Sequence, residues 1–173
     1  MQRFATALLL SVMFLPTLGD PGSAQQVRSE RLLGGNENPP VISDGSGSFR
    51  ARLRDDRISF RLRYDVASDG SDVLQAHLHI ANPGTNGDVV AFLCANVEDA
   101  PTDRECPPSP GEVTGDIFAE DVLPIPRDTG DLIEAEDLEG LKRLIRQSSV
   151  YANVHTNDHP GGEIRGQLEP RRR

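Results

Sequence analysis

The stretch FRARLRDDRISFRLRYDV at residues 49–66 decides the fold class. Apolar residues occupy every second position on both sides of a polar break at residues 54–57; they are Phe49, Ala51, Leu53, Ile58, Phe60, Leu62, Tyr64 and Val66. Because successive strand side chains point to opposite faces, this alternation predicts a β-hairpin with one apolar face. The other face carries Arg50, Arg52, Arg61 and Arg63, which we interpret as a solvated surface; salt-sensitive binding of acidic polymers by this face is the less favoured alternative.

The rest of the chain continues this pattern with one interruption. Period-two segments recur at residues 74–80, 150–155 and 164–168, and a continuous apolar run of strand length covers residues 89–93. Between residues 131 and 147 the period becomes helical, with Leu138, Leu141, Leu144 and Ile145 on one side. We therefore predict an all-β fold, an antiparallel Greek-key-like β-sandwich with one short helix.

Charge and the amino terminus bear on the compartment and on the partners. The 173 residues include 27 acidic and 18 basic side chains, and this net charge of −9 disfavours nucleic acid as a ligand. Arg3, an apolar run over residues 4–18 and the small residues at 22–24 are typical of a signal peptide. We expect residues 1–24 to be removed, a single domain over 25–170, a solvated basic tail at 171–173, and a secreted or periplasmic product without a membrane span.

The two cysteines, Cys94 and Cys106, both lie in the predicted mature domain. Disulfides persist outside the cytoplasm, so we predict that these two residues pair. A bridge closing a loop of this length stabilises a fold by roughly 3 kcal/mol in the chain-entropy model. A two-cysteine metal site is the less favoured alternative, because the usual Cys-x2-Cys spacing is absent.

All four histidines fall into two motifs, His77-x-His79 and His155-x3-His159. Residues i and i+2 of a strand point the same way, and a histidine pair joined by histidines of a neighbouring strand can bind copper or zinc. Asp158 or Glu163 would then offer a carboxylate ligand, and Asn153 or Gln75 an outer hydrogen bond; the sequence does not show that the two strands are neighbours.

A structural role is the competing interpretation of the same histidines. In it, His77, His79 and His155 hydrogen-bond to Asn153, Thr156 and turn backbone and so fix the loops that follow the strands. Glu163 and Arg165 are then a charge pair on one strand face. No nucleophile stands in a recognisable catalytic setting, so we expect no enzyme activity.

Several of these residues resemble motifs of the CHRD domain family, the module repeated in the animal protein chordin. The similar segments are Gly34-Gly35-Asn36-Glu37-Asn38-Pro39-Pro40, Ala76-His77-Leu78-His79-Ile80, Gly84-Thr85-Asn86-Gly87, Tyr151-Ala152-Asn153-Val154-His155-Thr156 and Pro160-Gly161-Gly162-Glu163-Ile164-Arg165-Gly166. The cysteine-bearing insertion between Cys94 and Gly111 departs from the family pattern, and His159 stands where the signature is less defined. The resemblance implies a β-sandwich-like extracellular module without an assigned enzyme activity.

The functional expectation is accordingly a secreted, non-catalytic binding or structural module. Its partner would be an extracellular or envelope macromolecule that the sequence does not name. The alternative is a mononuclear copper or zinc protein that uses the four histidines.

Overall fold

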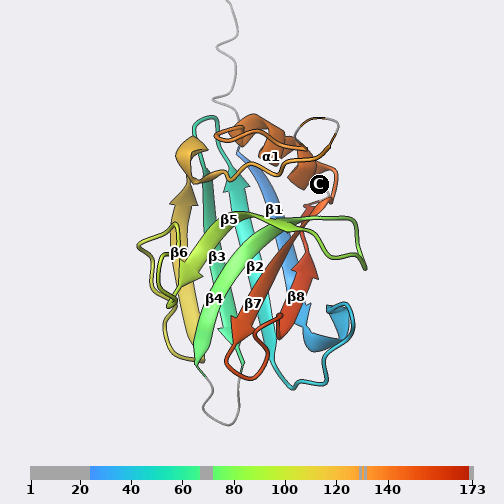
Figure 1. The fold of residues 1–173 in the computed structure, drawn as a ribbon, viewed down its shortest axis with the longest axis vertical. Helices are drawn as coiled ribbons and strands as arrows, with labels where there is room; N and C mark the ends of the chain where they lie inside the picture. Colours follow the sequence, from blue (N-terminus) through green and yellow to red (C-terminus); the bar gives the residue numbers. More distant parts are fainter. Residues whose placement is uncertain (1–23, 67–71, 129, 131, 172–173) are drawn as a thin grey trace, which may run out of the picture.

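The computed structural model describes residues 24–66, 72–128, 130 and 132–171, so the expected signal peptide lies outside the described residues except for Ala24. The elements in chain order are β1 (Gln25–Leu33), β2 (Ser46–Leu53), β3 (Ile58–Asp65), β4 (Val73–Ile80), β5 (Asp88–Ala95), β6 (Gly111–Ile117), α1 (Leu138–Arg146), β7 (Val150–Thr156), β8 (Ile164–Gln167) and β9 (Glu169–Pro170), with short 3-10 turns at Gly34–Asn36 and Ala119–Asp121. Figure 1 shows their arrangement. The predicted all-β class with one short helix is confirmed.

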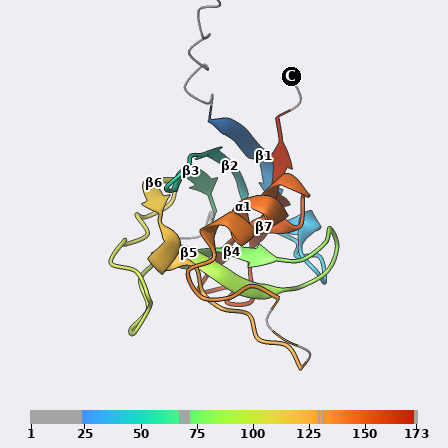
Figure 2. The same cartoon turned by 90° about the horizontal axis from the view of Figure 1, so that it is seen from above.

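One antiparallel sheet builds the molecule, in the order β5-β4-β7-β8-β1-β2-β3-β6, with β9 added beside β1. Seen from above, the sheet curls around a central core, so that its two halves face each other as the layers of a sandwich do (Figure 2). Helix α1 lies across one end of the curled sheet. The described part of the chain contains no helix long and apolar enough to cross a membrane.

The hairpin predicted from residues 49–66 is formed by β2 and β3. Phe49 pairs with Leu62 and Ala51 with Phe60 across the two strands. Every apolar residue of the predicted face is buried, and the arginines at positions 50, 52, 61 and 63 are exposed. This alternation identified both the strands and the face that packs into the core.

Strand β1 was not expected from the sequence, although it lies between β8 and β2 in the middle of the sheet. Val27 and Leu32 are buried, but they are five residues apart and do not share a strand period. A register shift between Ser29 and Leu32 explains this spacing, because a bulge changes which side chains face the core. Beyond β9, the backbone amide of Arg171 donates to the carbonyl of Gln26 at 3.0 Å, so the predicted basic tail begins with an anchored residue.

The disulfide between Cys94 and Cys106 is present, which confirms the predicted pairing. It ties the loop after β5 to the edge of the sheet, where Arg104 bridges the two edge strands β5 and β6. The Arg104 guanidinium donates to the carbonyls of Phe92 and Leu93 at 3.4 Å on β5 and to that of Asp116 at 2.9 Å on β6. Arg104 thus links β5 and β6, the two strands at the ends of the sheet order, through its side chain.

Helix α1 begins after Asp137, whose carboxylate accepts a hydrogen bond from the amide of Gly140 at 2.7 Å. This contact satisfies one of the free amides at the helix start. Leu138, Leu141 and Ile145 are buried. The buried Lys142 ammonium donates to the carbonyls of Arg54 and Asp55 at 2.9 and 3.0 Å, which attaches the helix to the turn between β2 and β3.

Candidate metal centre

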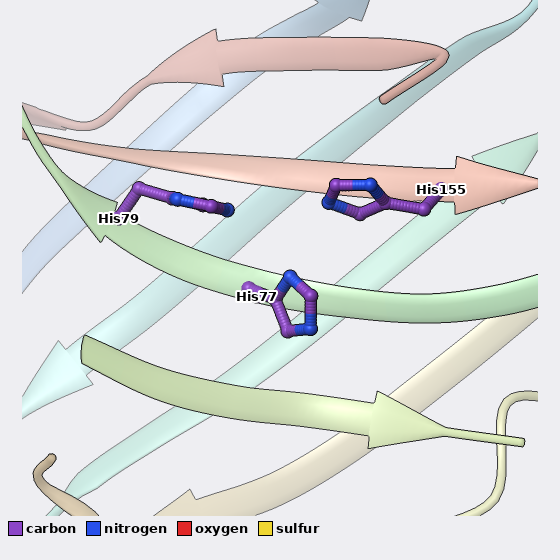
Figure 3. A group of neighbouring side chains, drawn as sticks. All are labelled: His77, His79 and His155. Atoms are coloured by element: carbon purple, nitrogen blue, oxygen red, sulfur yellow. The ribbon is translucent and has the colours of Figure 1, made fainter. Parts of the chain in front are cut away.

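Three of the four histidines lie together because β4 and β7 are antiparallel neighbours. In this pairing Gln75 is opposite His155, and His77 is opposite Asn153. His77 and His79 are two residues apart on β4 and so point to the same face as His155 on β7. Figure 3 shows the three rings together over one face of the two strands. The sequence predicted the shared face of His77 and His79 but could not predict the pairing of the strands.

The rings of the cluster are close enough to meet one ion. The ring centroids of His77 and His155 are 4.9 Å apart, those of His77 and His79 5.5 Å, and those of His79 and His155 6.2 Å. One ring nitrogen from each residue lies within 4.8 Å of the other two. Three imidazoles bound at about 2.1 Å to one ion have nitrogens roughly 3.5 Å apart, so side-chain shifts of about 1 Å close the site.

These histidines are buried, although they lie on the face that the sequence marks as polar. His77 is 3% exposed, His79 8% and His155 7%. The ring of Phe92 packs edge-on against His77 with centroids 4.4 Å apart, and the ring of Tyr151 stacks on His79 at 4.8 Å. The cluster is therefore a second, polar interior on the outer side of the sheet.

Two of the rings have their orientation fixed by backbone carbonyls. Nδ1 of His79 lies 2.9 Å from the carbonyl oxygen of Gly87, and Nδ1 of His155 lies 3.0 Å from that of Pro160. Because a carbonyl only accepts, each Nδ1 carries the proton and each Nε2 keeps its lone pair. This arrangement is the one in which metal-binding histidines are held by an outer hydrogen bond.

The remaining ring nitrogens have no hydrogen-bond partner within the described part of the chain. They are Nε2 of His79 and His155 and both ring nitrogens of His77, and all four atoms are buried. A buried polar atom without a partner costs roughly 1–3 kcal/mol. The three side chains thus leave unsatisfied nitrogen lone pairs in one enclosed place.

Burial keeps the three rings neutral. Desolvation, followed by the neighbouring histidines His155 and His79, lowers the pKa of His77 to about 3. Desolvation also lowers the pKa of His79 to about 4, against a smaller opposing effect of the Gly87 hydrogen bond. The pKa of His155 is lowered by the same cause. Burial therefore favours the neutral, metal-binding form of all three imidazoles.

The other predicted site residues lie outside this cluster. His159 is half-buried in the turn after β7, where its backbone amide donates to Thr156 Oγ1 at 3.2 Å, and it is not part of the three-histidine group. Asp158 is exposed. The Glu163 carboxylate accepts hydrogen bonds from the hydroxyls of Ser43 at 2.6 Å and Thr156 at 2.7 Å. The described residues bring no carboxylate into the group of histidines.

The predicted hydrogen bonds of the histidines are right in one respect. Turn backbone does orient His79 and His155, as expected for the structural interpretation. Asn153 and Thr156 bond elsewhere, because the Asn153 amide donates to Glu37 Oε2 at 3.3 Å and the Thr156 hydroxyl donates to Glu163. The structure therefore corrects the expected partners of the rings: the turn backbone orients two of them, and Asn153 and Thr156 do not.

Comparison with known families accounts for the motifs around this cluster. The family model described as CHRD domain matches residues 29–168. The chain belongs to the CHRD domain family. No curated protein and no solved structure matches the chain.

The CHRD motifs meet at the rim of the histidine cluster. The Glu37 side chain, from the first motif, is 8% exposed and accepts the hydrogen bond from Asn153 of the last. Gly162 lies against both, with a φ of 122°, and an added Cβ there would stand 2.8 Å from the Asn153 amide and 3.0 Å from Glu37 Oε1. Only glycine suits this backbone and this space.

A second set of contacts joins the same segments of the CHRD domain. Asn86 donates from its amide to the carbonyl of Asn38 at 2.8 Å. Arg165 donates to Asn86 Oδ1 at 3.0 Å and to the carbonyl of Thr85 at 2.8 Å, and its guanidinium lies 3.9 Å from the centre of the Tyr151 ring. The sequence did not indicate roles for Glu37, Asn86 or Tyr151, because their partners are far away in the chain.

Proposed function

We propose that this CHRD domain is an extracytoplasmic, non-catalytic module that binds one transition-metal ion through His77, His79 and His155. The observation that carries the proposal is the convergence of neutral imidazoles whose buried nitrogens lack hydrogen-bond partners in the described chain. Imidazole is a common ligand of copper and zinc. The non-catalytic assignment is supported by the burial of the unpartnered ring nitrogens in the described chain, which keeps them from contact with a substrate in solution.

A purely structural role for the histidines explains less of this geometry. Hydrogen bonds to Gly87 and Pro160 hold two rings, but they leave the inward-facing nitrogens unsatisfied. Three apolar side chains would fill the same space without that cost. A bound ion would accept the unpaired nitrogen lone pairs of the cluster, while the Nδ1–H groups of His79 and His155 keep their hydrogen bonds to backbone carbonyls.

The experiment is metal analysis of the purified domain without a histidine tag. Mass spectrometry counts bound ions, and thermal melting is measured with chelator and with added copper or zinc. We expect one ion per chain and a raised Tm, because a ligand that binds only the folded state stabilises it. His155→Leu should abolish both effects, and His159→Leu, in the turn outside the cluster, should leave both unchanged. Neither ion bound and no change in Tm would refute the proposal.

The extracytoplasmic location is supported by the signal-like amino terminus and by the disulfide. Disulfides are rare in proteins that stay in a reducing cytoplasm. The Cys94–Cys106 bridge is formed in the structure. Amino-terminal sequencing of the protein exported by an expression host tests this location, and the expected first residue is Gln25.

A second candidate function, binding of an acidic extracellular polymer, is favoured by the arginines of the β1-β2-β3 face. Arg28 is directly opposite Arg50, and Arg50 is directly opposite Arg61. Like charges in a cross-strand row destabilise a sheet unless something neutralises them. Glu30 pairs with Arg28 and Arg50 at 3.0 and 3.1 Å and Glu112 pairs with Arg61 at 3.6 Å, so two carboxylates face the three arginines of the row. A groove of about 830 Å³ runs along the row.

Binding to a sulfated polysaccharide tests this second function. We expect affinity to fall steeply with added salt, because exposed charges are screened. Arg50→Ser and Arg61→Ser together should abolish the binding. Affinity that is independent of salt, or unchanged in the double variant, would contradict it.

A further inference from the structure

The chemical character of the three-histidine cluster restricts which ion it can hold. All three ligands are neutral imidazoles, and no aspartate, glutamate or cysteine of the described residues belongs to the group. Both cysteines are joined in the disulfide. An ion bound here would therefore keep its full charge, since no ligand of the group carries a negative charge.

The rings lie against aromatic side chains and near the guanidinium of Arg165. His77 packs on Phe92, and His79 packs on Tyr151. The guanidinium of Arg165 lies 3.9 Å from the centre of the Tyr151 ring, on a residue that itself stacks on His79. Repulsion from this guanidinium disfavours a dication about twice as strongly as a monocation.

Burial strengthens this discrimination. The ring nitrogens that face inward are inaccessible to solvent. The energetic penalty of moving an ion from water into a low-dielectric interior grows with the square of its charge, so a dication pays about four times the penalty of a monocation of similar size. Zinc also requires a fourth ligand, a protein group or a water, beyond three histidines. No carboxylate or thiolate of the described residues joins the group to serve as that fourth ligand.

We propose that the three-histidine centre is selective for Cu(I) over Zn(II) and Cu(II). This inference rests on the proposed metal-binding function and specifies its ion. Cu(I) carries a single charge and accepts three nitrogen ligands without a bound water. The domain would thereby hold copper in its reduced form, shielded from solvent and from exchange with divalent ions.

The test is an anaerobic titration of the mature domain with Cu(I) in competition with a coloured Cu(I) chelator. Parallel competition titrations use Zn(II) and Cu(II). We expect one Cu(I) per chain and an affinity at least about 100-fold above that for either dication, a ratio that corresponds to about 2.7 kcal/mol. His155→Leu should weaken Cu(I) binding by a similar factor, and His159→Leu should leave it unchanged.

A further variant tests the electrostatic reason for the selectivity. Arg165→Gln keeps a hydrogen-bond donor for Asn86 and removes the positive charge near the site. The ratio of Cu(I) to Zn(II) affinity should fall severalfold, because a dication gains twice as much as a monocation from losing that charge. The ratio compares two ions on one protein, so a general loss of stability does not change it. An unchanged ratio would overturn the electrostatic argument.

The outcomes separate this inference from the function on which it rests. Cu(I) preferred by the expected margin supports both. Zn(II) or Cu(II) bound as tightly as Cu(I), and lost in His155→Leu, would overturn the selectivity for Cu(I) and keep the metal-binding function. No binding of any of the three ions would overturn both.

Discussion

His77 is predicted to lower the stability of the metal-free domain. The change to test is His77→Leu, which keeps a similar volume on β4 and removes two buried ring nitrogens without partners. Each such atom costs roughly 1–3 kcal/mol, and the lost edge-on contact with Phe92 returns about 1 kcal/mol. At pH 7 we expect the free energy of unfolding of the variant to be about 1–5 kcal/mol higher than that of the wild type.

The advantage of His77→Leu should grow on acidification. The pKa of His77 is about 3 in the folded protein, against an ordinary 6.5 when unfolded. Between these values the unfolded chain binds a proton that the folded chain refuses, so the wild type loses stability as the pH falls. At pH 5 this adds about 2 kcal/mol, since 1.5 pH units at 1.36 kcal/mol each separate it from 6.5. We therefore expect a total difference of about 3–7 kcal/mol at pH 5.

Urea denaturation of both proteins, in chelator at pH 7 and at pH 5, measures the two differences. His159→Leu is the matched control, because His159 is half-buried in a turn and outside the cluster, and its change should stay within about 0.5 kcal/mol at both pH values. A variant less stable than the wild type would refute the reasoning from unsatisfied nitrogens. A difference that does not widen at pH 5 would refute the assignment of a neutral, buried imidazole.

Three other changes test the fold and its charges. Arg104→Met, which leaves the carbonyls of Phe92 and Asp116 without their donor, should lower the free energy of unfolding by about 1–3 kcal/mol in urea titrations. Replacing both cysteines by alanine should lower it by about 3 kcal/mol, and an equal loss from dithiothreitol on the wild type is the check. Desolvation raises the pKa of Glu37 to about 7, so the ionised carboxylate lowers the free energy of unfolding increasingly as the pH rises above 4.5. Glu37→Gln should therefore stabilise the apoprotein more at pH 8 than at pH 5 in the same urea titrations.

The sequence predicted the elements whose signals are local. The hairpin of β2 and β3 and helix α1 are recognisable because each carries an apolar period within one segment. Strand β1 was missed because its bulge spoils that period and its polar residues face solvent, so that only its neighbours β8 and β2 define it. Arg104 was missed for a related reason, since its three carbonyl partners belong to two different strands.

For the candidate site too, only features set by nearby residues could be predicted from the sequence. The spacing of His77 and His79 gave their common direction, but their contact with His155 depends on the pairing of β4 with β7, which lies 70 residues and more away in the chain. Their burial was missed altogether. Polar residues at every second position of a strand predict a face exposed to solvent. In the structure the rings of Phe92 and Tyr151 cover this face.

The histidines that should destabilise the metal-free domain are the same residues that are proposed to bind the ion. A cluster that serves stability should satisfy its polar atoms, as Lys142 and Arg104 do with backbone carbonyls elsewhere in this domain. The three-histidine cluster instead buries ring nitrogens that have no hydrogen-bond partner in the described chain; they belong to His77, His79 and His155. If His77→Leu stabilises the apoprotein and abolishes ion binding, the histidines lower the free energy of unfolding of the metal-free domain. Binding of the ion would then restore that stability, because a ligand that binds only the folded state stabilises it.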